Sequence, residues 1–148
     1  MMEAKIENKQ IYKYDLLEKT IFGILYFYNK EISKTKLAAL LYLLSDTIGE
    51  LKEYINPYIY IKSLRLYDSS MNRIIDYHFD LKHFINVDYI KDIISLSKSG
   101  HKNIKELIES FPKEELEAIR EIIERYGNLS EKELIDLIIE KAKKLLIQ

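Results

Sequence analysis

Lysines and tyrosines gather in two stretches of the sequence where they could bind an anion. Lys34 and Lys36 stand at the start of an apolar segment, and Lys62 and Arg65 lie among tyrosines further along. Lysines at a helix N-terminus oppose the helix dipole, so they are not explained by helix stability, and they could hold phosphate with the free N–H groups there. Tyrosine rings between cations could stack on unpaired bases, although twelve tyrosines also serve ordinary packing.

A second set of polar side chains falls on one face of a helix predicted to begin at residue 69 or 70. Asn72 and Arg73 on this face could read base edges in a major groove. Asp76 and Asp80 share the face and would meet DNA phosphates with like charge. DNA contact and an ordinary solvated surface therefore both stay open for this helix.

The same helix carries a pattern that could bind a metal ion. Asp76, Asp80 and His83 stand at i, i+4 and i+7, which brings two carboxylates and an imidazole to one side. No fourth ligand is evident, and His78 falls on the apolar stripe, where a core histidine is expected. We expect no metal site.

Catalytic motifs do not emerge from the sequence. A nucleophilic serine needs a histidine and an orienting group in a defined context, and no serine is framed by glycines. Only four glycines occur, and none form a phosphate-cradling loop. We expect a protein that is not an enzyme and has no catalytic residue and no cofactor.

The amino-acid composition restricts the classes of function that remain. With 148 residues, 47% of them hydrophobic, the chain can build one ordinary domain. The 23 basic and 24 acidic residues nearly cancel, so any nucleic-acid surface must be a local patch. Cysteine is absent, and no apolar run is long enough for a signal peptide or a membrane span. We expect a cytoplasmic protein without a membrane partner. The amino-acid usage is typical of thermophiles, and an A/T-rich genome would give a similar bias.

Hydrophobic periodicity predicts the first elements. A helix over residues 14–28 places Leu17, Ile21, Ile24 and Leu25 on one stripe, and a second helix follows Ser33 as its N-cap. Alternation over residues 58–61 predicts one short strand before the helix at residue 69. Residues 84–96 are rich in β-branched side chains and predict two antiparallel strands joined near residues 89–92.

The last part of the sequence predicts three helices. A short helix should span residues 100–109, and Pro112 should start the next, which ends at Gly127. Ser130 and Glu133 form a capping box before a helix to about residue 146. This last helix is apolar on more than one side, which predicts self-association or capture of a protein partner; the residues concerned are Leu134, Ile135, Ile138, Ile139 and Leu145.

The predicted order is helix, helix, strand, helix and hairpin, followed by C-terminal helices. This order is typical of a winged-helix domain, a relative of the helix-turn-helix, although a mixed helical domain of other topology fits it too. The predicted class is α+β, mostly α. One domain spans residues 1–148, with a winged-helix-like core over residues 12–100 and a helical extension over residues 101–148.

Two stretches resemble a known family. Residues 36–43, KLAALLYL, resemble the Lys-Leu-Gln-Lys-Leu-Leu-Tyr core of the Panacea antitoxin domains and their prokaryotic relatives. Tyr126-Gly127-Asn128-Leu129-Ser130, continuing to Leu134, is similar to their Tyr-Gly-x-Leu-Ser-x-x-x-Leu pattern. Between these stretches, residues 94–100 resemble the strand and glycine that precede the family's C-terminal helices. The resemblance implies an antitoxin-like role in neutralising a toxin.

The sequence departs from the family at two places. The family's Gln-Lys pair is replaced by Ala38 and Ala39, and the family's Tyr-Gly-Pro turn is missing near residues 66–69. We therefore expect a non-catalytic, winged-helix-type regulator or adaptor of prokaryotic or mobile-element origin, homodimeric through its C-terminal helices. It would contact double-stranded DNA through Lys34, Lys36, Lys62, Arg65, Asn72 and Arg73. The alternative is an antitoxin-like module that binds a protein through its last helix.

Overall fold

The elements of the fold are mostly helical. The computed structural model describes residues 15–54 and 69–147. Over these residues the chain forms six α-helices, one 3-10 helix and three short strands, which confirms the predicted α+β, mostly α class. The elements in chain order are α2 (Asp15–Tyr28), β1 (Ile32–Ser33), α3 (Lys34–Leu44), the 3-10 helix η1 (Gly49–Tyr54), α5 (Ser69–Asp80), β2 (Ile85–Asp88), β3 (Ile93–Leu96), α6 (Lys98–Glu109), α7 (Lys113–Tyr126) and α8 (Glu131–Ile147).

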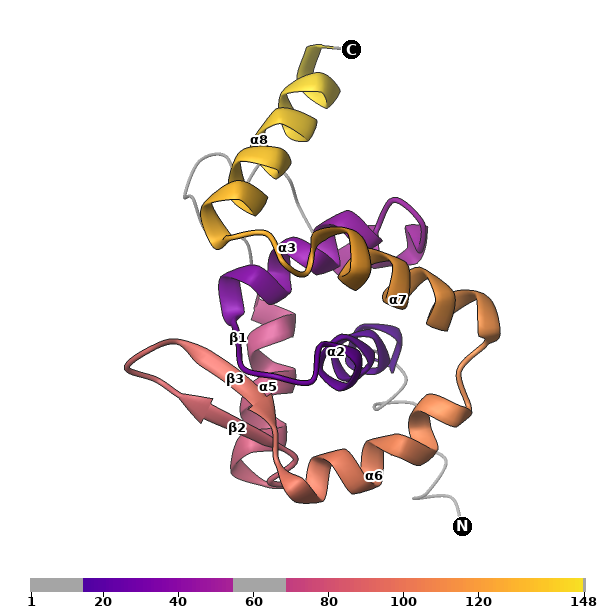
Figure 1. Ribbon diagram of the computed structural model, residues 1–148, viewed down its shortest axis with the longest axis vertical. Helices are drawn as coiled ribbons and strands as arrows, with labels where there is room; N and C mark the ends of the chain where they lie inside the picture. The colour runs from indigo at the N-terminus through magenta and orange to yellow at the C-terminus, as the bar shows by residue number, and fades with distance from the viewer. Residues whose placement is uncertain (1–14, 55–68, 148) are drawn as a thin grey trace.

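Helix α2 occupies the centre of the fold. Figure 1 shows it end-on, with α3, α5, α6 and α7 around it. The predicted stripe of Leu17, Ile21, Ile24 and Leu25 is buried, and Phe22 from outside this stripe is buried as well. A helix that is apolar around most of its circumference is covered on more than one side, and here the surrounding helices cover it.

The three strands form one antiparallel sheet in the order β1-β3-β2. The predicted hairpin is confirmed, because β2 and β3 pair antiparallel and residues 89–92 join them. Strand β1 pairs with β3 through Ile32 opposite Ile94 and Ser33 opposite Ile93. The sequence did not predict β1, and the strand predicted over residues 58–61 lies outside the described residues.

Helix α3 begins as predicted and is more deeply buried than predicted. Ser33 is extended, and its hydroxyl accepts a hydrogen bond from the Lys36 backbone N–H at 3.0 Å. Its residues from Leu37 to Leu44 are all buried, since α2 and α7 pack against this helix and α8 packs against it as well. Ala38 and Ala39, which replace the polar pair of the resembling family, are therefore core residues here.

The C-terminal helices share the core of the preceding elements. Ile104, Ile119 and Leu134 belong to the same buried cluster as the side chains of α2 and α3. Helix α6 begins at Lys98, two residues earlier than predicted, so Gly100 lies inside it. The predicted capping box is confirmed by hydrogen bonds from Ser130 N to Glu133 Oε1 at 3.2 Å and from Glu133 N to Ser130 Oγ at 3.1 Å.

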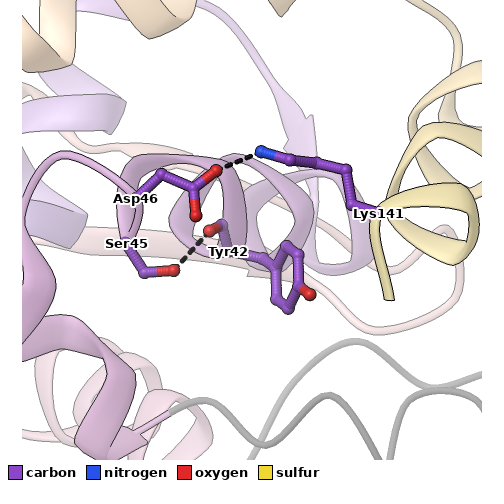
Figure 2. Close-up of polar contacts among 4 residues, drawn as sticks. All are labelled: Tyr42, Ser45, Asp46 and Lys141. Carbon is purple, nitrogen blue, oxygen red and sulfur yellow. Dashed lines mark hydrogen bonds and ion pairs between the residues drawn. The ribbon is translucent and has the colours of Figure 1, made fainter. Parts of the chain in front are cut away.

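One ion pair joins α8 to the end of α3. The Lys141 ammonium contacts the Asp46 carboxylate, and the Ser45 hydroxyl donates to the Tyr42 carbonyl beside it (Figure 2). Burial raises the pKa of the Tyr42 phenol above its ordinary value of 10.0, Asp46 raises it further, and Lys141 lowers it. The folded chain therefore keeps this phenol protonated at a pH where the unfolded chain has released its proton.

This raised pKa makes stability fall at alkaline pH. The stabilising contribution of the protonated Tyr42 phenol is fully present below pH 10.0, the ordinary pKa of tyrosine. It is lost as the pH rises through the pKa of the folded state, because in that range the unfolded state binds fewer protons than the folded state. We expect Tyr42→Phe to reduce the decline in the free energy of unfolding above that pH. Urea denaturation of the wild-type protein and of Tyr42→Phe, each below and above pH 10.0, measures the decline in unfolding free energy. Equal declines in the two proteins would contradict the assignment.

Candidate nucleic-acid interface

Tyr89 at the hairpin tip joins three elements of the fold. Its hydroxyl donates to Asp76 Oδ1 of α5 at 3.5 Å, and its ring meets the Phe79 ring edge-on at 5.7 Å. The Lys34 ammonium of α3 lies 5.4 Å from the centre of the same ring. The Lys34 backbone N–H also donates to the Asp92 carbonyl at 3.2 Å. The hairpin tip, α5 and the start of α3 therefore form one continuous surface.

Three lysines at the start of α3 contact aromatic rings. The Lys30 and Lys36 ammonium groups lie 5.0 and 5.2 Å from the centre of the Tyr28 ring, and Lys34 lies over Tyr89. Within residues 15–54 and 69–147, no carboxylate forms an ion pair with any of the three. A cation over a ring keeps its full charge. These three lysines, which we call the lysine cluster, can therefore bind an external anion.

The backbone of α3 contributes less to anion binding than the sequence predicted. The Lys34 N–H is taken by the Asp92 carbonyl and the Lys36 N–H by the Ser33 hydroxyl. Lys34 is only 8% exposed, so the exposed Lys30 and the half-buried Lys36 are the more accessible cations of the lysine cluster. Phosphate contact here would depend on the ammonium groups rather than on free N–H groups at the helix end.

Two of the other predicted DNA contacts lie on α5. Arg73 is exposed on α5 and Asn72 is half-buried. Partial burial and the carboxylates of Asp76 and Asp80 raise the pKa of the Tyr89 phenol above 10.0, so this side of α5 carries negative charge. Lys62 and Arg65 lie outside the described residues. Of the six predicted contacts, Lys34 and Lys36 lie over two different rings, those of Tyr89 and Tyr28, and Asn72 and Arg73 lie on α5 beside acidic side chains.

Sequence reasoning missed two lysines on α6. Lys98 and Lys102 are exposed in its first turns, which contain no acidic residue. The His101 Nε2 and Asn29 Oδ1 atoms lie 2.9 Å apart and join α6 to the end of α2, directly before Lys30. The run Lys-Ser-Gly-His-Lys over residues 98–102 is the sequence signal that could have indicated this basic surface.

Two of the five predicted partner-binding residues are buried inside the fold. Leu134 is 0% exposed and Ile138 is 1% exposed, because α8 packs against α3. Ile135 and Ile139 are half-buried, and the Leu145 side chain lies outside the described residues. Leu134 and Ile138 are core residues and cannot form an accessible surface on this fold. Packing against α3 accounts for Leu134 and Ile138, whereas Ile135 and Ile139 keep part of their surface exposed.

His78 is a core residue, as predicted. It is 5% exposed and packs among the rings of Phe22, Tyr77 and Phe84. Its Nε2 lies 3.3 Å from Glu18 Oε1, the nearest charged group. Across the described residues, no three histidine, aspartate or glutamate side chains gather in a way that could hold a metal ion.

Comparisons with known proteins do not assign the site. No family model matches the chain, and neither the curated proteins nor the solved structures contain a match. In the two described ranges, every helix is too short or too polar to cross a bilayer. The function therefore has to be inferred from the geometry of the surface.

Proposed function

We propose that the protein is a non-catalytic, DNA-associated regulator or adaptor that binds phosphate through the lysine cluster. The observation that carries this proposal is the position of three ammonium groups over tyrosine rings, Lys30 and Lys36 over Tyr28 and Lys34 over Tyr89. No described carboxylate neutralises them. A DNA duplex carries a dense row of phosphates with counterions condensed around them. Lysines that contact the phosphates displace these counterions into solution, which favours binding. The exposed Lys98 and Lys102 could extend the contact along α6.

The order of the elements supports a winged-helix assignment. Strand β1 lies between the first two helices, α5 directly precedes the hairpin, and the sheet order is β1-β3-β2. In Figure 1 the hairpin extends from the side of the helical body like a wing. The connection from α3 to α5 over residues 45–68 is longer than the roughly 3–4-residue turn of a helix-turn-helix. The assignment therefore rests on the sheet and the hairpin.

The charges around α5 favour contact with the DNA backbone over base reading. Asp76 and Asp80 would approach phosphates if α5 entered a major groove. Lys34 and Lys36 stand at the start of α3, and backbone contacts of this kind position a protein without reading sequence. We therefore propose binding to duplex DNA with little sequence preference.

Replacement of the lysine cluster tests this function. The triple variant Lys30→Gln, Lys34→Gln, Lys36→Gln should bind a labelled random-sequence duplex more weakly at low salt. Each lost phosphate contact lowers the slope of log K against log salt by about 0.9, so the triple variant should lose roughly 2 to 3 of that slope. Fluorescence anisotropy over a salt series measures both quantities, and circular dichroism verifies the fold of the variant.

A matched variant controls for the lost charge. Lys113→Gln, Lys132→Gln, Lys143→Gln removes three exposed lysines from α7 and α8 and should change the salt slope far less. Wild-type protein that binds no duplex even at low salt would refute the proposal. Equal losses in the two triple variants would show that net charge, and not the cluster, attracts the DNA.

An antitoxin-like role is the second candidate. The observation that favours it is the position of α8, whose C-terminal part extends away from the other helices in Figure 1. Ile135 and Ile139 are half-buried on this helix, so a protein partner could extend their contacts. An apolar protein interface responds little to salt, whereas DNA binding weakens steeply as salt rises. The salt series therefore separates the two candidates.

A further inference from the structure

The exposed large apolar side chains gather on one part of the fold. Among the described residues they are Tyr77, 45% exposed, Leu81, 68%, Tyr89, 59%, and Ile90, 98%. All four belong to α5, to the residue after it or to the hairpin tip. Exposed apolar residues that cluster in this way mark an interaction surface. The sequence had predicted such a surface on α8, where Leu134 is instead fully buried.

Helix α5 presents these side chains along a single line. Arg73, Tyr77, Asp80 and Leu81 follow each other at i, i+4, i+7 and i+8, and all four are exposed. The Leu81 N–H donates to the Tyr77 carbonyl at 3.0 Å, so the helical path continues through Leu81. We call these four residues the α5 stripe. The opposite side of α5 is buried in the core through Met71, Ile74, Ile75 and His78.

The charges of the α5 stripe complement those of a second copy. A cation, Arg73, stands at one end, an anion, Asp80, stands at the other, and Tyr77 lies between them. When two identical helices pack antiparallel about a two-fold axis, each end of one helix meets the opposite end of the other. Arg73 of each copy then faces the Asp80 and Leu81 turn of its partner, and the two Tyr77 rings meet at the axis.

We infer that the α5 stripe is the interface of a homodimer in which two α5 helices pack antiparallel. This inference goes beyond the proposed function and does not depend on it. None of Lys30, Lys34 and Lys36 belongs to the stripe, so the dimer could present two lysine clusters. Arg73 would pair with a carboxylate of the second copy and would not contact DNA. The dimer would use α5, whereas the sequence predicted the C-terminal helices.

Charge exchange across the axis tests the inference. Sedimentation equilibrium of the full chain should show a mass that rises with concentration toward twice 17.6 kDa. Arg73→Asp and Asp80→Arg should each weaken dimerisation by roughly tenfold or more, because each places like charges opposite one another. The double variant Arg73→Asp, Asp80→Arg restores opposite charges and should recover wild-type dimerisation. The same exchange at two exposed α6 residues, Lys105→Asp with Glu109→Lys, is the control and should change nothing.

The double variant keeps the test independent of folding. Single variants that merely unfold the chain would not be rescued by a second charge change, so recovery identifies contact between Arg73 and Asp80. A wild-type chain of monomeric mass at all concentrations would overturn the inference, and so would single variants that dimerise normally or a double variant that fails to recover. No DNA is present in this measurement, so its outcome is separate from that of the anisotropy experiment.

Discussion

Gly100→Ala is expected to lower the free energy of unfolding by about 1–3 kcal/mol, the usual range for overpacking, which reverses the usual effect of this substitution. Inside a helix, alanine normally replaces glycine with a gain of about 0.5–1 kcal/mol. At Gly100 the added Cβ would lie 2.0 Å from the Phe84 carbonyl oxygen, which belongs to the backbone. This carbonyl also accepts a hydrogen bond from the Ser97 N–H at 2.9 Å. Because this backbone carbonyl cannot move easily, the first turn of α6 must move away from Phe84, which directly precedes strand β2.

Urea denaturation of Gly100→Ala beside Gly49→Ala measures this effect. A Cβ at Gly49 would meet nothing within 4 Å, so that variant should stay within about 0.5 kcal/mol of wild type. A Gly100→Ala protein as stable as wild type would mean that α6 does not pack against the Phe84 backbone. The comparison therefore tests the junction that connects the hairpin to the C-terminal helices.

Local signals in the sequence predicted the element boundaries best. The Ser33 cap and the Ser130–Glu133 capping box are hydrogen bonds between residues close in sequence, so their side-chain types are sufficient to locate them. The hairpin over residues 84–96 was also predictable, because β-branched residues lie on both sides of the turn at residues 89–92. In each case the residues that stabilise the feature belong to one short stretch of the sequence.

Features that depend on distant partners could not be predicted. Strand β1 has only two residues, Ile32 and Ser33, and it exists because β3 pairs with it from far along the chain. The helix was predicted to begin at Gly100, and α6 begins two residues earlier, at Lys98. Residue 100 must be a glycine because the Phe84 backbone approaches it closely, and no local pattern indicates this approach.

The candidate site was predicted only in part, for a related reason. The charge pattern identified Lys34 and Lys36, because lysines at a helix start are unfavourable for the helix. The contacts of the Tyr89 ring with Lys34 and Asp76 depend on the tertiary fold, since the hairpin must fold back onto α3 and α5. No periodicity in the sequence encodes that approach. The tyrosines therefore looked like general packing residues until the structure placed them.

Leu134→Ala is expected to cost about 2–5 kcal/mol of unfolding free energy, the range for removing a fully buried leucine side chain. Leu134 is 0% exposed, and it belongs to the same buried cluster as the residues of α3 and α7. The sequence assigned this residue to a partner interface, where its replacement would leave the isolated chain's stability nearly unchanged. The two assignments therefore predict different results in a single denaturation experiment.

Ile135→Ala on the same helix is the matched comparison. Ile135 is half-buried, so less apolar area is lost and the cost should be clearly smaller than for Leu134→Ala. Equal small costs at both positions would mean that α8 is loosely attached, and its apolar residues would again be available to a partner. A large cost at Leu134 with a small cost at Ile135 would mean that α8 is held by α3. Leu134 would then be a core residue and would not be available to a partner.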